Sequence, residues 1–324
     1  MNLLNHLLYL SEADVARVGV SLDALREAVA AAFAAQARGE GAAAPKSVIT
    51  LGPGHVFQAK PAIVRSSGYT CVKWFGLVPP GSTAGPSISS LILLSDIPSG
   101  MAVAIMGGYW ITAKRTAAMT AIAAQKLARA DSESIGFVGA GVQGHSHLEA
   151  LRLVLPRLKR VTVCSRTEQS AQKLAGAARA AGLEAVTTRD PRAAVQGMDV
   201  VITTVPEGTE KLEFLDPDWV APGAFVGAVD LARSWMRGKI PSFDLLATDE
   251  HEQTRVLTAA GRMTWAGPYA AELSELCSGA HPGRGDPRQR IMFNYSGHAL
   301  ADLAGAQLVY ETARRRAIGT VLPR

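Results

Sequence analysis

The chain has 324 residues, a length that suits two domains of ordinary size rather than one small core. Hydrophobic residues make up 48% and charged residues 19%, and this balance excludes a disordered or fibrous protein. The formal net charge is +5, but the basic residues are spread along the chain. We therefore expect a pocket for anionic small molecules and no nucleic-acid partner.

Cysteine spacing and hydropathy limit the function classes further. The three cysteines lie far apart without a CxxC pair, and the histidines lack metal-ligand spacing, so we expect neither a disulfide framework nor a metal site. The most apolar stretch, 91–106, is interrupted by Asp, Pro and Gly, and the N-terminus lacks the features of a signal peptide. These observations predict a soluble, cytoplasmic protein with no membrane partner.

The first third of the chain predicts a pair of helices followed by a sheet. Helix-start signals at Ser11 and Ser21 predict two helices, the second running to about Arg38. Short apolar runs then alternate with Gly and Pro turns, which indicates an antiparallel or mixed sheet. The expected strands are 47–51, 56–59, 69–75, 87–94 and 101–106.

A helix expected at 111–129 leads into a second pattern, in which short apolar strands alternate with helices. This alternation indicates a parallel, doubly wound sheet, because right-handed crossovers place helices on its faces. The expected strands are 134–138, 160–164, 199–205, 224–229 and 245–248, and the expected helices between them are 142–155, 168–181 and 191–195. A long amphipathic helix is expected at 297–318.

The strongest motif is a GxGxxG that follows an apolar strand and opens a helix. Its residues are Gly139, Ala140, Gly141, Val142, Gln143 and Gly144. Glycine permits the tight turn, the close approach of a pyrophosphate and the packing of the helix on the strand, while the helix N-terminus presents free N–H groups to the phosphates. The motif predicts a dinucleotide site; the alternative is a purely structural glycine-rich turn.

The next strand ends differently from that of a typical NAD site. An Asp or Glu usually binds the ribose hydroxyls there, whereas this chain has Ser165, Arg166 and Thr167. Ser and Arg would bind a 2′-phosphate, which favours NADP(H), with NAD(H) as the alternative. Arg166 would otherwise stack on the adenine or face solvent. Thr204 and Val205 are expected at the nicotinamide crevice, although strand preference also explains a threonine there.

Five segments resemble a known family in their order and spacing. They are Val72-Lys73-Trp74, residues 94–100 (LSDIPSG), residues 110–118 (WITAKRTAA), the glycine motif at 139–144, and Gly297 followed by 299–304 (ALADLA). Together they resemble the ornithine cyclodeaminase/μ-crystallin family across nearly the whole chain. The Arg-Thr-Ala-Ala segment just before the nucleotide-binding half is the most specific piece.

The resemblance implies an α/β protein of two domains that forms a homodimer. Residues 117–297 would form a Rossmann-type, doubly wound parallel sheet that binds NAD(P). Residues 1–116 with 298–324 would form an α+β domain that binds substrate and dimerises. Family activities include reduction of cyclic ketimines, ornithine cyclodeamination, alanine dehydrogenation and opine-like imine reduction, and some members bind thyroid hormone.

The resemblance also implies roles for particular residues. Lys73 matches the active-site lysine, Arg115 the arginine that holds the substrate carboxylate, and Asp230 the catalytic carboxylate, although it comes earlier than in the cyclodeaminase pattern. Lys46 stands where the family often has arginine, which makes a weaker carboxylate clamp. The implied cofactor site adds the hydroxyl residues Ser87, Thr116 and Ser296.

An α-imino acid has a carboxylate beside an electrophilic carbon, so its reductase needs a cationic clamp, a hydride donor and a group that manages the proton on nitrogen. Arg115 and Lys73 can form the clamp, and Asp230 is the candidate acid. The residue patterns alone leave alternatives open: a solvated edge-strand lysine for Lys73, a structural salt bridge for Arg115, and a turn or helix-cap aspartate for Asp230.

These observations predict an NAD(P)H-dependent reductase of a small α-imino acid such as pyrroline-2-carboxylate or piperideine-2-carboxylate. An ornithine or lysine cyclodeaminase that recycles NAD is the first alternative. An amino acid dehydrogenase or opine-like synthase, and a catalytically silent μ-crystallin-like binding protein, are the others. Ser165 and Arg166 favour the reductase, since a cyclodeaminase has no need of NADPH.

Overall fold

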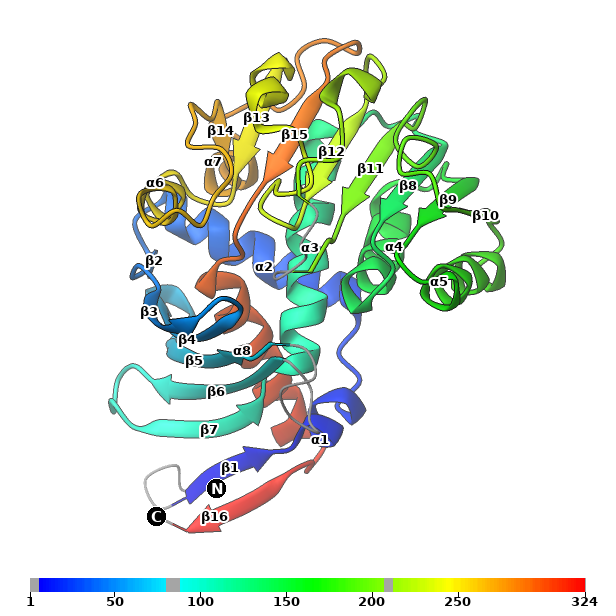
Figure 1. Ribbon diagram of the computed structural model, residues 1–324. Coiled ribbons are helices and arrows are strands. Elements are labelled where there is room, and N and C mark those ends of the chain that lie inside the picture. Colours follow the sequence, from blue (N-terminus) through cyan, green and yellow to red (C-terminus); the bar gives the residue numbers. More distant parts are fainter. Residues whose placement is uncertain (1–5, 80–87, 207–211, 324) are drawn as a thin grey trace. The chain divides into compact units, whose positions relative to one another are not determined.

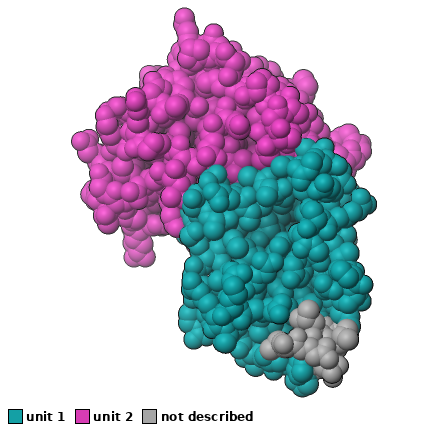
Figure 2. All heavy atoms as spheres, turned by 180° about the vertical axis from the view of Figure 1, so that it is seen from behind, with its two compact units in different colours: residues 1–116, 297–324 teal, residues 117–296 magenta. Residues whose placement is uncertain are grey.

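The computed structural model describes residues 6–79, 88–206 and 212–323. The chain divides into two compact units, coloured separately in Figure 2. Unit 1 comprises residues 1–116 and 297–324, and unit 2 comprises residues 117–296.

Unit 1 is built on an eight-stranded mixed sheet in the order β16-β1-β7-β6-β5-β4-β2, with β3 paired to β4. All neighbours are antiparallel except β1 and β7. The strands are β1 (His6–Leu10), β2 (Gly41–Ala43), β3 (Ser47–Gly52), β4 (His55–Val64), β5 (Tyr69–Leu77), β6 (Ile88–Asp96), β7 (Ala102–Gly107) and β16 (Thr320–Pro323).

Helices cover one face of this sheet and leave the other face open. α8 (Ala299–Arg315) packs on β4, β5 and β6, and α2 (Leu22–Ala37) packs on α8 (Figure 1). Ser11 and Ser21 cap α1 (Glu12–Arg17) and α2, as the sequence predicts. The first half of α3 (Tyr109–Leu127) and the short 3₁₀ turn η1 (Arg65–Ser67) complete the unit.

Unit 2 contains an entirely parallel sheet in the order β10-β9-β8-β11-β12-β15-β13-β14. The strands are β8 (Ser134–Val138), β9 (Arg160–Cys164), β10 (Glu184–Thr188), β11 (Val200–Thr203), β12 (Phe225–Ala228), β13 (Leu245–Thr248), β14 (Ala271–Glu272) and β15 (Ile291–Asn294). The chain runs outward from β8 through β9 to β10, then returns to β11 on the other side of β8. A switch point of this kind is where doubly wound sheets bind ligands.

The connections in unit 2 are helices and 3₁₀ turns. They include α4 (Val142–Val154), α5 (Glu168–Ala180), α6 (His251–Ala259), α7 (Leu273–Ser278), η2 (Pro217–Trp219) and η3 (Arg237–Ser242). The helix expected at 191–195 is wrong: the segment is a run of turns, begun by a proline and ended by Gly197 with φ +74°. Sequence analysis also missed β1, β2, β10, β14, β15 and β16.

Across the described ranges, no helix combines the length and apolar character needed to cross a bilayer. All three cysteines carry free thiols.

Candidate functional site

The glycine loop of unit 2 has the geometry that a dinucleotide requires. Gly139 has φ +106°, and a Cβ there would lie 2.5 Å from Oγ1 of Thr204, so only glycine fits. Gly141 is the N-cap of α4 without a side-chain cap, and a Cβ there would meet nothing within 4 Å. The loop therefore leaves open space in front of the uncapped N–H groups of a helix N-terminus.

Two polar atoms beside this loop are buried and lack a partner. Within the described part of the chain, Oγ1 of Thr204 and Oε1 of Gln143 accept or donate no hydrogen bond. Thr204 directly follows β11, and its N–H donates to the carbonyl of Val138 at the end of β8, 2.9 Å away. Buried polar groups normally have partners, so these orphans fit a polar ligand at the switch point. The residues present thus fit a dinucleotide.

The rest of the loop and its surroundings lie as follows. Ala140 is buried, Val142 opens α4 with an exposed side chain, and Val205 follows Thr204 at the end of β11. Ser296 follows β15, and its hydroxyl lies 3.5 Å from Oδ2 of Asp249. Each of these residues is at the carboxyl edge of the unit 2 sheet.

Two further expected cofactor residues are Thr116 and Ser87. The hydroxyl of Thr116, on α3 at the end of unit 1, donates to the carbonyl of Thr112 at 2.7 Å. Ser87 falls outside the described residues.

A buried histidine anchors the first turn of α4. Nδ1 of His147 lies 2.7 Å from the carbonyl of Gln143, and its Nε2 lies 3.0 Å from the hydroxyl of Thr120, which is 2.7 Å from that of Tyr295. Burial lowers the pKa of His147 to about 4, so the ring is neutral at neutral pH. His147 therefore connects the phosphate loop to α3 and to the end of β15, a role that the sequence alone did not reveal.

Two arginines gather at the ends of β9 and β10. Arg166 is exposed after β9, and Thr167 caps α5 by accepting a hydrogen bond from the Ser170 N–H at 3.4 Å. Nη1 of Arg189, which follows β10, donates to the carbonyl of Arg166 at 3.2 Å. Sequence analysis missed Arg189. It could have been noticed as a second basic residue that directly follows a strand, here β10.

Unit 1 contains a buried ionic cluster. Nζ of Lys73 on β5 lies 2.7 Å from Oδ1 of Asp302 on α8 and 3.2 Å from Oγ1 of Thr112. Nε of Arg115 on α3 lies 2.8 Å from the same Asp302 oxygen. A Cβ on Gly297 would lie 2.5 Å from Nη1 of Arg115, so this glycine makes room for the guanidinium. The cluster brings together both members of the predicted clamp.

The cluster stays ionised over a wide pH range. Burial lowers the pKa of Lys73 to about 8, although Asp302 opposes the shift. Burial alone would raise the pKa of Asp302, but Arg115 and Lys73 outweigh it and lower the pKa to about 2. Lys73 is fully buried, which excludes the solvated edge-strand alternative. Arg115 does form a salt bridge, with Asp302, and the pair of cations still exceeds the single carboxylate.

Two further lysines lie near this cluster. Lys60 is directly opposite Lys73 in the β4–β5 register, on the same buried face. Lys46 immediately precedes β3, and both Lys46 and Lys73 depress the pKa of Lys60, whose own burial is the largest cause of the shift. Sequence analysis identified Lys46 but missed Lys60 and Asp302. In the sequence, Asp302 could have been noticed as the single carboxylate in the otherwise apolar segment 299–304 (ALADLA).

Asp230 lies at the switch-point edge of unit 2. It comes just after β12 and is buried, and its Oδ1 accepts a hydrogen bond of 2.8 Å from the hydroxyl of Thr203 at the end of β11. Oδ2 has no partner among the described residues, and burial raises the pKa of the carboxyl. The next two residues, Leu231 and Ala232, have φ of 61° and 56°. Non-glycine residues adopt such angles at a cost that functional sites often carry.

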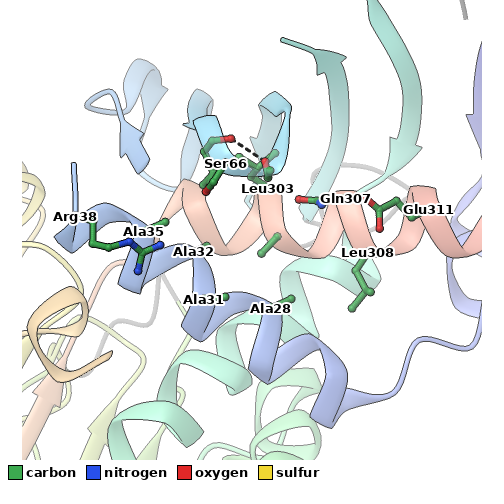
Figure 3. A pocket seen from close by; sticks show the side chains of 13 residues that line it. Ala28, Ala31, Ala32, Ala35, Arg38, Ser66, Leu303, Gln307, Leu308 and Glu311 are labelled. Atoms are coloured by element: carbon green, nitrogen blue, oxygen red, sulfur yellow. Dashed lines mark hydrogen bonds between the residues drawn. The ribbon is translucent and has the colours of Figure 1, made fainter. Parts of the chain in front are cut away.

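One hollow of unit 1 is lined by none of the residues of the buried ionic cluster. It measures about 280 Å³ between α2 and α8, and Figure 3 shows alanines of α2 facing Leu303, Gln307 and Glu311 of α8. We therefore assign the groove no part in the site. Over the described ranges, no three His, Cys, Asp or Glu side chains gather as a metal site would require.

The match to a known family decides the identity of the chain. The family model described as "Ornithine cyclodeaminase/mu-crystallin family" matches residues 8–317. The chain belongs to the ornithine cyclodeaminase/mu-crystallin family. This result confirms the resemblance found in the sequence.

Individual members of the ornithine cyclodeaminase/mu-crystallin family are similar over most of the chain. The ketimine reductase mu-crystallin of Mus musculus is 35% identical over 235 residues, which is 71% of this chain and 72% of the mouse protein. The solved structure of an archaeal alanine dehydrogenase dimer with bound NAD has a TM-score of 0.87 at 26% identity, covering 98% of this chain and 99% of the other.

A further solved structure is the Thermococcus litoralis Delta(1)-pyrroline-2-carboxylate reductase in complex with NADH and L-proline. Its TM-score is 0.86 at 26% identity, covering 97% of this chain and 99% of the other. These likenesses confirm the α/β fold class, with its Rossmann-type parallel sheet and mixed second sheet. The relatives are NAD(P)-dependent oxidoreductases or cyclodeaminases, so the chain has the family and fold of an enzyme.

Proposed function

We propose that the protein is an NAD(P)H-dependent reductase of small α-imino acids. One observation carries this proposal: Lys73 and Arg115, two buried cations, share one carboxylate oxygen of Asp302, in a chain that also has a dinucleotide loop. The two cations and the one carboxylate carry a net positive charge, which suits the binding of a substrate carboxylate. The cyclic imino acids pyrroline-2-carboxylate and piperideine-2-carboxylate belong to this substrate class.

Each residue of the proposed site has a separate role. Arg115, with the planar fork that matches a carboxylate, binds and orients the substrate together with Lys73 and Lys46. The glycine loop, Thr204 and Gln143 hold the cofactor, which when bound supplies a hydride for the imine carbon. Burial raises the pKa of Asp230, which favours the protonated carboxyl, and we assign it the transfer of a proton to the nitrogen.

We further propose NADP(H) as the preferred cofactor. Arg166 follows β9 and Arg189 follows β10, in the region where NAD sites usually have an acid. Replacing either arginine by Ala should weaken NADPH binding by about tenfold to a hundredfold and leave NADH binding nearly unchanged. Arg152→Ala, which removes an exposed arginine of α4, is the control. Equal affinity of the wild type for NADH and NADPH would contradict the preference.

The experiment for the activity compares imines with and without a carboxylate. Consumption of reduced dinucleotide should occur with imines of 2-oxo acids and not with imines of simple ketones. Arg115→Ala should lower kcat/KM for the carboxylate substrates by roughly thirtyfold to several thousandfold, the effect of truncating a buried charge pair. Arg38→Ala, in the groove of Figure 3, should leave it unchanged.

We also propose a cytoplasmic homodimer that forms through the open face of the unit 1 sheet. That face exposes large apolar side chains, with relative exposures from 47% to 65%: Ile49, Leu51, Trp74 and Leu91. Apolar patches of this kind commonly mark protein interfaces. Leu91→Lys should shift the protein toward monomer in sedimentation velocity, and a wild-type monomer would contradict the proposal.

A further inference from the structure

Lys60 is a buried lysine of strand β4. Its relative exposure is 6%, and its ammonium lies over the ring of Phe75 at 5.4 Å from the centroid. No carboxylate of a described residue is close enough to form an ion pair with it. Burial and the neighbouring cations lower the pKa of Lys60 well below its usual value, so an anionic partner would stabilise the charged form of this side chain.

The register of the sheet shows where that partner would be. Lys60 on β4 and Lys73 on β5 are a directly opposed pair, and their side chains share the face that α8 covers. Opposed residues on one face have Cβ atoms about 5 Å apart. The two flexible side chains therefore start about 5 Å apart, within reach of two carboxylates that are joined by one or two carbon atoms.

The charges around Lys60 are unbalanced. The charged groups that act on it are Lys46 before β3, Lys73 on β5, Arg115 on α3 and Asp302 on α8. Asp302 is already shared by Lys73 and Arg115. A substrate with one carboxylate would serve the Arg115–Lys73 pair and leave Lys60 without a partner. A second carboxylate on the substrate would neutralise the charge of Lys60.

We propose that the substrate is an α-imino dicarboxylic acid, with Lys60 binding the carboxylate farther from the imine. This inference rests on the proposed function and narrows its substrate class. The carboxylate next to the imine carbon binds Arg115 and Lys73, and the second lies one or two carbons away. The product is then an α-amino dicarboxylic acid of the aspartate or glutamate type.

The test compares imines formed from ammonia with oxaloacetate, 2-oxoglutarate or pyruvate. The wild type should have a kcat/KM about tenfold to a thousandfold higher with a dicarboxylic imine than with the pyruvate imine. Lys60→Met should lose most of this preference, and Lys60→Arg should retain part of it. Arg65→Met, which removes an exposed cation just after β4, should keep the wild-type preference. An equal loss of both activities in Lys60→Met would overturn the proposal in favour of a structural or proton-transfer role.

Calorimetry separates this inference from the activity itself. With oxidised dinucleotide present, the wild type should bind L-aspartate or L-glutamate at least about tenfold more tightly than L-alanine, and Lys60→Met should not. If no imine is reduced but this binding preference is found, the proposed reductase function is wrong and the role of Lys60 stands. If the wild type binds L-alanine as tightly as the dicarboxylic acids, the role of Lys60 is wrong whatever the activity.

Discussion

The ammonium of Lys73 lies 2.7 Å from Oδ1 of Asp302, and both side chains are fully buried although 229 positions separate them in the chain. The pair joins strand β5 to α8, so the segment that returns to unit 1 brings the counter-ion of Lys73 with it. Removing one partner of such a pair leaves the other as an uncompensated buried charge.

Asp302→Asn should therefore destabilise the protein by about 3–5 kcal/mol, because it leaves both Lys73 and Arg115 without a carboxylate. Urea unfolding of the variant measures the loss. Asp23→Asn breaks an exposed pair with Arg26 on α2 and should cost less than about 1 kcal/mol. Similar losses in the two variants would show that the buried cluster does not stabilise unit 1.

Substrate affinity should depend on pH through Lys73, whose pKa burial lowers to about 8. A lysine is charged below its pKa, so carboxylate binding is fully present below pH 8 and weakens as the pH rises through that value. KM for α-imino acids should increase above about pH 8, and in Lys73→Arg, which keeps its charge, this increase should disappear. An affinity that stays constant up to about pH 10 would remove Lys73 from carboxylate binding.

Asp230→Asn should lower kcat by about 10²–10⁴ while leaving the fold intact, since it removes a proton donor but keeps the shape of the side chain. Burial raises the pKa of Asp230, so its carboxyl contributes stability at low pH that is lost as the pH rises through the folded-state pKa. The uncharged amide should thus be at least as stable as wild type at neutral pH. Normal turnover in this variant would move the proton-donor role to another group.

The glycine loop offers a matched pair of substitutions. Gly141→Val should cost about 1 kcal/mol of stability or less, because space is open there, but should weaken both dinucleotides by at least about tenfold. Gly139→Val should destabilise the fold itself, since φ is +106° and the new Cβ would meet Thr204. Thermal unfolding and fluorescence titration with NADPH distinguish them. Unchanged dinucleotide affinity in Gly141→Val would place the cofactor elsewhere.

Sequence reasoning predicted the parts of the fold that have local signals. The strands β8, β9, β11, β12 and β13 are apolar runs between turns, and the glycine motif fixes the β8–α4 connection. β1 and β16 have no such signal, because each is a short strand whose partners come from the far ends of the chain: Leu8 pairs with Val321 and Ala104. Their pairing is set by tertiary structure and not by local pattern.

The site was predictable to the extent that its residues belong to motifs. Lys73, Arg115 and the glycine loop stand in recognisable segments, and the structure places Lys73 and Arg115 around one carboxylate. Lys60 was missed although it lies on the same face of β4 as Val56, Ala62 and Val64. The sequence pattern alone does not tell which face of the sheet α8 covers. Asp302 was missed because its partners are distant in sequence.

The most direct test of the central claim follows reduced and oxidised cofactor in two parallel reactions. One contains NADPH with pyrroline-2-carboxylate, piperideine-2-carboxylate or the imines of 2-oxo acids, and the other contains ornithine or lysine with NAD and an ammonia assay. Our account predicts stoichiometric NADPH oxidation in the first reaction and no ammonia release in the second. Ammonia release without net change of the cofactor would contradict the account and make the protein a cyclodeaminase.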